Sequence, residues 1–218
     1  MKNPPRHIIL FFSFLLLSFN ANGQDVSKLL SSLDTMQSPT QKLDTLIKIT
    51  NLYPGENNLP IALEYCAKVF QLNKSIEQYD FWTMKAKFGE NVITGNTNLD
   101  SLKLIVNSLD ERIITGDFLN FVAERCYYFF YSDYTIELAQ EALNLSEKTN
   151  DVCQMAFSYL IIAITNYYND NVSDAIRDLK KAKKLFYSIE DIEGIMVSNT
   201  YLSKFYSSIY YLRNPKRG

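Results

Sequence analysis

The feature that most restricts the fold of this chain is a repetition of residue types at a fixed spacing along the sequence, namely the number of positions that separates Leu119 from Tyr159. We call this number the repeat length. Within each copy, apolar, small and aromatic residues lie three or four positions apart, which places their side chains on one face of a helix. A repetition of this kind predicts helical pairs that stack on one another. The matching residues are Leu119, Val122, Ala123, Cys126, Tyr127 and Tyr128 with Tyr159, Ile162, Ala163, Asn166, Tyr167 and Tyr168, then Thr135, Ile136, Ala139, Ala142 and Leu145 with Ala175, Ile176, Leu179, Ala182 and Leu185.

Three further copies extend the pattern over nearly the whole chain. One includes Phe88, which precedes Val122 by slightly less than the repeat length, another includes Leu46, and an incomplete one begins at Asn199. The sequence thus predicts four helical pairs and the opening helix of a fifth, preceded by a capping helix within 24–42. The repeats are expected at 43–76, 82–115, 116–149, 156–189 and, in part, 196–218. Helices are expected at 27–36, 42–53, 60–74, 78–94, 99–113, 117–131, 135–149, 152–168, 172–188 and 193–211.

The copies resemble the tetratricopeptide repeat, in which an apolar, a small and an aromatic residue on one helix are followed by two small residues seven positions apart on the next. Small residues allow helices to approach within about 8–10 Å of each other. The resemblance implies an all-α fold, a right-handed α-solenoid of helix-turn-helix repeats; a generic helical bundle is the alternative. The chain departs from the family pattern in its single Trp82, its missing closing prolines and its longer repeat length. The two small residues seven positions apart on the second helix of a repeat are Ser101 and Ser108, Thr135 and Ala142, and Ala175 and Ala182.

The first 23 residues are typical of an export signal. Lys2 and Arg6 precede twelve mostly apolar residues at 8–19, and small residues around Ala21 offer a cleavage site. Twelve helical residues span about 18 Å, short of the ~30 Å hydrocarbon core of a bilayer. We therefore expect a cleaved signal peptide at 1–23, with an uncleaved anchor as the alternative, and an exported chain that is periplasmic or secreted. No later run has transmembrane length, so no membrane span is expected in the mature chain.

The composition disfavours several kinds of chemistry. The single histidine, His7, lies in the predicted signal peptide, so the mature chain would lack the imidazole that most catalytic triads and many zinc sites use. The sequence has no phosphate-binding glycine loop and no paired-cysteine motif. Cys66, Cys126 and Cys153 are expected to be buried thiols that pack as small hydrophobic residues, and a redox role is the alternative. A net charge of −2 and a pI near 5.5 disfavour nucleic acid. We expect no enzyme activity, no cofactor and no metal.

A binding surface is expected on the concave face of the repeats, which their first helices would line. Tyrosines at matching positions in adjacent repeats would supply large amphipathic contact area there, although they could equally fill gaps between helices. The implied partner is a protein or peptide, and self-association would use the same kind of contact. The candidate residues are Asn120, Glu124, Tyr127, Tyr128, Leu160, Ile164, Tyr167 and Tyr168.

Two functions follow from these features. The first is an exported scaffold for protein–protein interaction, as the sensory part of a signalling system; the repeats resemble the exported regions of bacterial, Bacteroidetes-like signalling proteins. The alternative is a fragment of a sensor kinase or transcriptional regulator that lacks its output domain, because the last predicted helix has no following partner. An exported hydrolase is disfavoured by the absence of a nucleophile motif.

Overall fold

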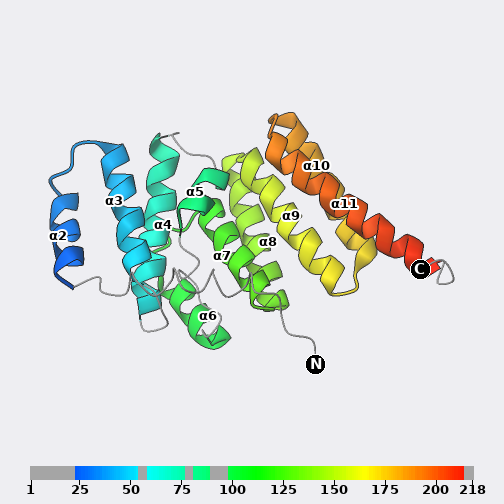
Figure 1. The fold of residues 1–218 in the computed structure, drawn as a ribbon, viewed down its shortest axis with the longest axis horizontal. Coiled ribbons are helices and arrows are strands. Elements are labelled where there is room, and N and C mark those ends of the chain that lie inside the picture. The colour runs from blue at the N-terminus through cyan, green and yellow to red at the C-terminus, as the bar shows by residue number, and fades with distance from the viewer. Residues whose placement is uncertain (1–22, 54–57, 77–80, 89–97, 214–218) are drawn as a thin grey trace, which may run out of the picture.

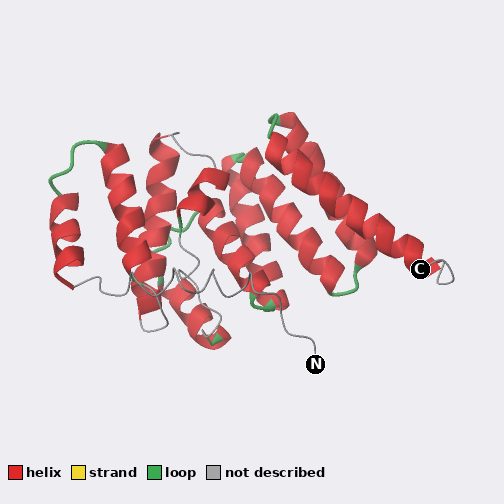
Figure 2. Ribbon diagram, in the orientation of Figure 1, coloured by secondary structure: helices red, strands yellow, loops and turns green. Residues whose placement is uncertain are grey.

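The computed structural model describes residues 23–53, 58–76, 81–88 and 98–213, and every regular element in these ranges is a helix (Figures 1 and 2). The predicted all-α class is therefore confirmed for the described residues. Among them, no helix has both the length and the apolar composition needed to cross a bilayer. The predicted signal peptide lies outside them apart from Gly23. The helices are α2 (Gly23–Leu33), α3 (Pro39–Leu52), α4 (Leu59–Ile76), α5 (Phe81–Lys87), α6 (Leu99–Ser108), α7 (Gly116–Tyr128), α8 (Ser132–Thr149), α9 (Val152–Tyr168), α10 (Val172–Ser188) and α11 (Ile192–Arg213).

The helices from α7 onward pack as successive neighbours along the molecule (Figure 1). Each of α7, α8, α9 and α10 contacts the helix that follows it in the sequence. In addition, α7 contacts α9, and α9 contacts α11, so these three helices form one layer, against which α8 and α10 pack. The helices expected at 152–168 and 172–188 have the predicted bounds.

The turns between these helices recur at the repeat length found in the sequence. Phe130 and Asp170 both have φ of 62°, and each stands at the same position after the end of a first helix. Asn150 and Glu190, which are separated by the same repeat length, have φ of 54° and 57° after the second helices. A left-handed residue after a helix end lets the next amide groups bond back to the last carbonyl oxygens. The repetition is thus present in the backbone conformation as well as in the side chains.

The small residues of two predicted repeats lie at the helix contacts. Thr135, Ala142, Ala175 and Ala182 are all completely buried, which confirms their predicted role. Gly194 in α11 serves the same purpose, because a β-carbon built on it would lie 2.3 Å from the ring of Phe186 in α10. The contact between α10 and α11 therefore requires a residue without a side chain at this position.

The N-terminal cap is a short helix, α2, whose bounds lie a few residues before those expected at 27–36. α2 ends at Leu33, and α3 begins at Pro39, whose fixed φ suits the first turn of a helix. The Oγ of Ser38 accepts a hydrogen bond from the backbone N–H of Gln41 at 3.4 Å. α2 still packs against α3, and Leu33 is buried there.

The predicted repeat at 82–115 departs furthest from its expected form. Ser101 and Ser108 are exposed, whereas Leu102 and Val106 are buried, so the assignment of these serines as small packing residues is wrong. The reason is that α6 turns a different face inward and contacts α4 (Figure 1). α5 has only seven residues, and the continuation expected up to residue 94 lies mostly outside the described ranges.

A cluster of buried phenylalanines connects the N-terminal helices with the layer of α7, α9 and α11. The ring centroid of Phe70 in α4 lies 6.2 Å from that of Phe81, 6.5 Å from that of Phe118 and 5.6 Å from that of Phe121. Phe81 in turn lies 4.3 Å from Phe157 in α9. Burying one such ring contributes roughly 1.5–3 kcal/mol, so this cluster fixes the position of the short helix α5.

Candidate functional site

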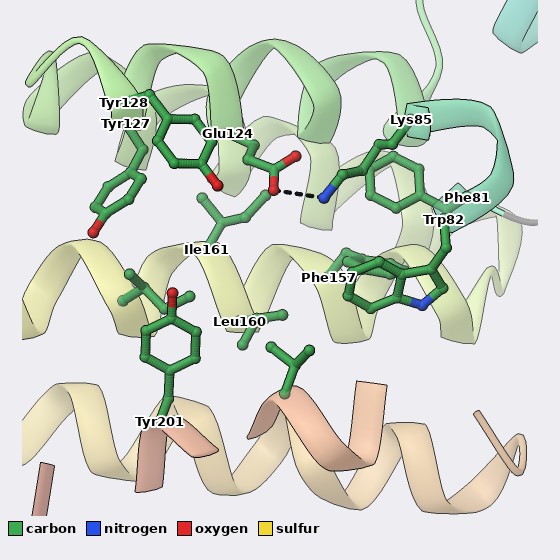
Figure 3. A pocket seen from close by; sticks show the side chains of 12 residues that line it. Phe81, Trp82, Lys85, Glu124, Tyr127, Tyr128, Phe157, Leu160, Ile161 and Tyr201 are labelled. Atoms are coloured by element: carbon green, nitrogen blue, oxygen red, sulfur yellow. Dashed lines mark hydrogen bonds and ion pairs between the residues drawn. The ribbon is translucent and has the colours of Figure 1, made fainter. Parts of the chain in front are cut away.

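A groove of about 290 Å³ lies over α9, with α7 and α11 on its two sides and α5 at one end (Figure 3). Most of its surface is apolar or aromatic, and its few polar groups lie at the edges. The groove is the structural feature most suited to binding, because pockets for ligands are concave and largely apolar with a few placed polar groups. Its lining residues are Phe81, Trp82, Lys85, Glu124, Tyr127, Tyr128, Phe157, Leu160, Ile161, Ile164, Val197 and Tyr201.

The floor of the groove is one face of α9. Phe157, Leu160, Ile161 and Ile164 follow each other at intervals of three, one and three positions, which brings them to the same side of the helix. Leu160 and Ile161 are only 5% and 7% exposed, so the floor is tightly packed against the rest of the protein. A rigid apolar floor loses little conformational freedom when an apolar group covers it.

An ion pair joins α5 to α7 across the edge of the groove. The Nζ of Lys85 lies 2.5 Å from Oε1 of Glu124, and both side chains are 20% exposed. The same ammonium lies 4.9 Å from the ring centre of Trp82, within the range of a cation–π contact. Figure 3 shows the two charged groups facing each other above the apolar floor.

Trp82 connects α5 to α9 and to the turn before α11. Its Nε1 donates a hydrogen bond to Oδ2 of Asp191 at 3.3 Å, in the turn between α10 and α11. Its ring contacts that of Phe157 edge-on, with the centroids 4.8 Å apart. α5 thus contacts α7, α9 and the turn that precedes α11, and it closes one end of the groove.

Tyrosines from α7 and α11 form the opposite end. The hydroxyl of Tyr127 donates a hydrogen bond to that of Tyr168, and burial together with this bond raises the pKa of Tyr127. The hydroxyl of Tyr168 also accepts from Nζ of Lys204, and that bond is the main cause of its lowered pKa. The hydroxyls of Tyr128 and Tyr201 instead point toward the groove in Figure 3.

The structure brings together five of the eight candidate residues as groove lining: Glu124, Tyr127, Tyr128, Leu160 and Ile164. Tyr168 lies beside the groove and holds Tyr127 through the bond described above. Tyr167 packs face to face with Phe205 of α11, with their centroids 4.0 Å apart. It therefore fills the space between helices, which was the alternative interpretation of these tyrosines.

Asn120 is the one candidate that the structure removes from the surface. Its side chain is completely buried between α7 and α9. The Nδ2 group donates to the backbone oxygen and to Oε1 of Gln154, both at 3.1 Å, and Oδ1 accepts from Oγ of Ser158 at 3.0 Å. A buried polar residue whose bonds are made inside the protein has a structural role, so the expectation that Asn120 lies on the concave surface is wrong.

Sequence reasoning missed the contribution of α5 and α11. Val197 and Tyr201 could have been found, because each follows its counterpart in α9, Phe157 or Ile161, by the repeat length and so continues the register. Trp82 carried no such signal, since its place in the groove depends on contacts with residues far away in the sequence.

A second group of charged residues lies outside the groove, where α4, α7 and α9 meet. Lys74 Nζ is 3.7 Å from Oδ1 of Asp117 and 3.2 Å from Oδ2 of Asp151. Burial raises the pKa of Asp117, although Lys74 opposes the increase. Among the described residues, no group of three or more histidine, cysteine or acidic side chains could hold a metal ion.

None of the three thiols lines the groove. Cys66 and Cys126 are buried, as expected, whereas Cys153 is only half-buried, and none of the three forms a disulfide. Burial raises the pKa of Cys126 to about 12.

Comparison of the chain with protein-family models, with curated proteins and with solved structures finds no match.

Proposed function

We propose that this chain is an exported scaffold of tetratricopeptide-type repeats, arranged as a right-handed α-solenoid, whose groove binds a peptide segment of a partner protein. The repeat assignment is supported by the turns at Phe130 and Asp170 and by the buried small residues of α8 and α10. Export is supported by the sequence of residues 1–23 alone.

The observation that carries the proposal is the apolar groove between α7 and α11. Its floor of four apolar side chains would gain hydrophobic stabilisation from a ligand that covers it. Several of its polar groups already have partners, Lys85 with Glu124 and Tyr127 with Tyr168 beside the groove, which suits a binding surface more than a reaction centre.

An array of random twelve-residue peptides tests the proposal. The mature chain should retain a subset of the peptides, and Ile164→Lys, which puts a charge on the half-buried floor, should lose them. Leu104→Lys is the matched control, because Leu104 is 71% exposed on α6 and lies outside the groove. Its peptide set should equal that of the unmodified chain. The proposal fails when no peptide is retained, or when all three proteins retain the same set.

A further inference from the structure

Resting on the proposed function, we infer that the groove selects a short extended segment with one uncharged aromatic or large aliphatic side chain, and that it rejects a charged side chain at the same position. The inference concerns the length of the groove from Trp82 at one end to Tyr201 at the other. It follows from the size of the groove, from the ion pair at its edge and from the hydroxyl groups that face it.

The size of the groove fits one anchoring side chain. Phe157 and Ile164 lie seven positions apart on α9, which corresponds to about 10 Å along the helix. An extended peptide covers this distance with about three residues. The volume of about 290 Å³ lies near the lower end for ligand pockets. One bulky side chain and its adjoining backbone fill such a space, whereas a whole helix does not.

The ion pair makes the groove selective for neutral side chains. Lys85 and Glu124 already neutralise each other, and each is only 20% exposed. An incoming carboxylate could bind Lys85 only by leaving Glu124 without its partner, and an incoming ammonium would do the reverse to Lys85. A partly buried charge without a partner is costly, so a charged ligand gains little from either group. An apolar side chain leaves the pair intact and covers the floor.

The hydroxyl groups suit the backbone of such a segment. Tyr128 and Tyr201 project from α7 and α11 toward the groove (Figure 3). A phenol hydroxyl can donate to a peptide carbonyl oxygen or accept from a peptide N–H. These two groups can hold the backbone at one end of the groove while the side chain extends along the floor, over Leu160 and toward Phe157.

The chain contains a tryptophan whose fluorescence can report binding in the groove. Trp82 is the only tryptophan in all 218 residues, and it lines the groove while half-exposed. Covering its ring should shift its fluorescence emission to shorter wavelength. Five peptides, acetyl-Gly-Ser-X-Ser-Gly-amide with X as Phe, Leu, Ala, Lys or Glu, are titrated against the mature chain. The Phe and Leu peptides should bind about tenfold or more tightly than the Ala peptide, and the Lys and Glu peptides no more tightly than it.

Single variants of the ion pair should change this selectivity in opposite directions. In Glu124→Gln the ammonium of Lys85 loses its acid, and the Glu peptide should gain about tenfold in affinity. In Lys85→Met the Lys peptide should gain instead. The exchange variant, Lys85→Glu with Glu124→Lys, keeps the pair neutral and should again prefer Phe. Circular dichroism melting of each variant shows that it is folded.

The outcomes separate the inference from the proposed function. The inference is overturned when a charged peptide binds the unmodified chain as tightly as the Phe peptide, or when the single variants leave the selectivity unchanged. It is also overturned when array peptides bind in a manner that requires Ile164 but leave the Trp82 emission unaltered. A complete absence of peptide binding, on the array and in solution, overturns the proposed function itself.

Discussion

The buried amide of Asn120 provides a prediction about stability that is independent of the groove. Its three hydrogen bonds join α7 to α9, two to Gln154 and one to Ser158. Asn120→Ala removes all of them. Ser158 keeps its bond to the backbone oxygen of Gln154, but Oε1 of Gln154, in a side chain that is 5% exposed, loses this donor.

The expected loss follows from these contacts. The backbone oxygen of Gln154 and Oγ of Ser158 remain bonded to each other, so the loss amounts to one net hydrogen bond, about 1 kcal/mol, and one buried acceptor left unpaired, about 1–3 kcal/mol. Asn120→Ala should therefore lower the free energy of unfolding by about 2–4 kcal/mol. For a chain of this length, each kcal/mol corresponds to about 2–4 °C, so the midpoint of thermal unfolding should decrease by roughly 5–15 °C.

Urea unfolding followed by circular dichroism measures this change. The matched control is Asn199→Ala on the exposed face of α11, which should change stability by less than about 0.5 kcal/mol. Ser158→Ala, alone and combined with Asn120→Ala, should show a coupling energy of at least about 0.5 kcal/mol. A loss below about 1 kcal/mol, or equal effects at Asn120 and Asn199, would refute the reasoning. Peptide binding measured well below the midpoint should remain unchanged, because Asn120 does not line the groove.

Three further changes have defined outcomes. Gly194→Ala forces a methyl group against the ring of Phe186 and should destabilise the chain by about 1–3 kcal/mol in urea unfolding, whereas an unchanged midpoint would contradict the close contact. Because burial raises the pKa of Asp117 above its ordinary 3.8, the stability that its protonated form provides is present at acid pH and is lost as the pH rises through the folded value. Asp117→Asn lacks this titration, so its stability relative to the unmodified chain should increase as the pH rises from the ordinary carboxyl pKa through the raised one, and a constant difference would contradict it. Ellman's reagent should modify Cys153 in the folded chain well before Cys126, which is completely buried, and equal rates would show that the fold opens at Cys126.

Much of the C-terminal half could be predicted from the sequence because its signals are local. The spacing of apolar residues sets which face of α9 or α10 is buried, and this spacing is visible within one helix. Ala142 and Ala182 were identified as contact residues for the same reason, since helices approach closely only where side chains are small. The constant repeat length then related one pair of helices to the next, and it placed Glu124, Tyr128 and Ile164 on one surface.

The tertiary structure alone decided the position of α5 and the direction of Asn120. Lys85 meets Glu124 and Trp82 meets Asp191, and no local periodicity encodes contacts between residues so far apart in the sequence. Asn120 lies four positions before Glu124, which lines the groove, so helical spacing alone permits its side chain to face either the groove or the contact between α7 and α9. Its amide turns inward because Gln154 and Ser158 of the neighbouring helix supply the hydrogen bonds that a buried polar group requires.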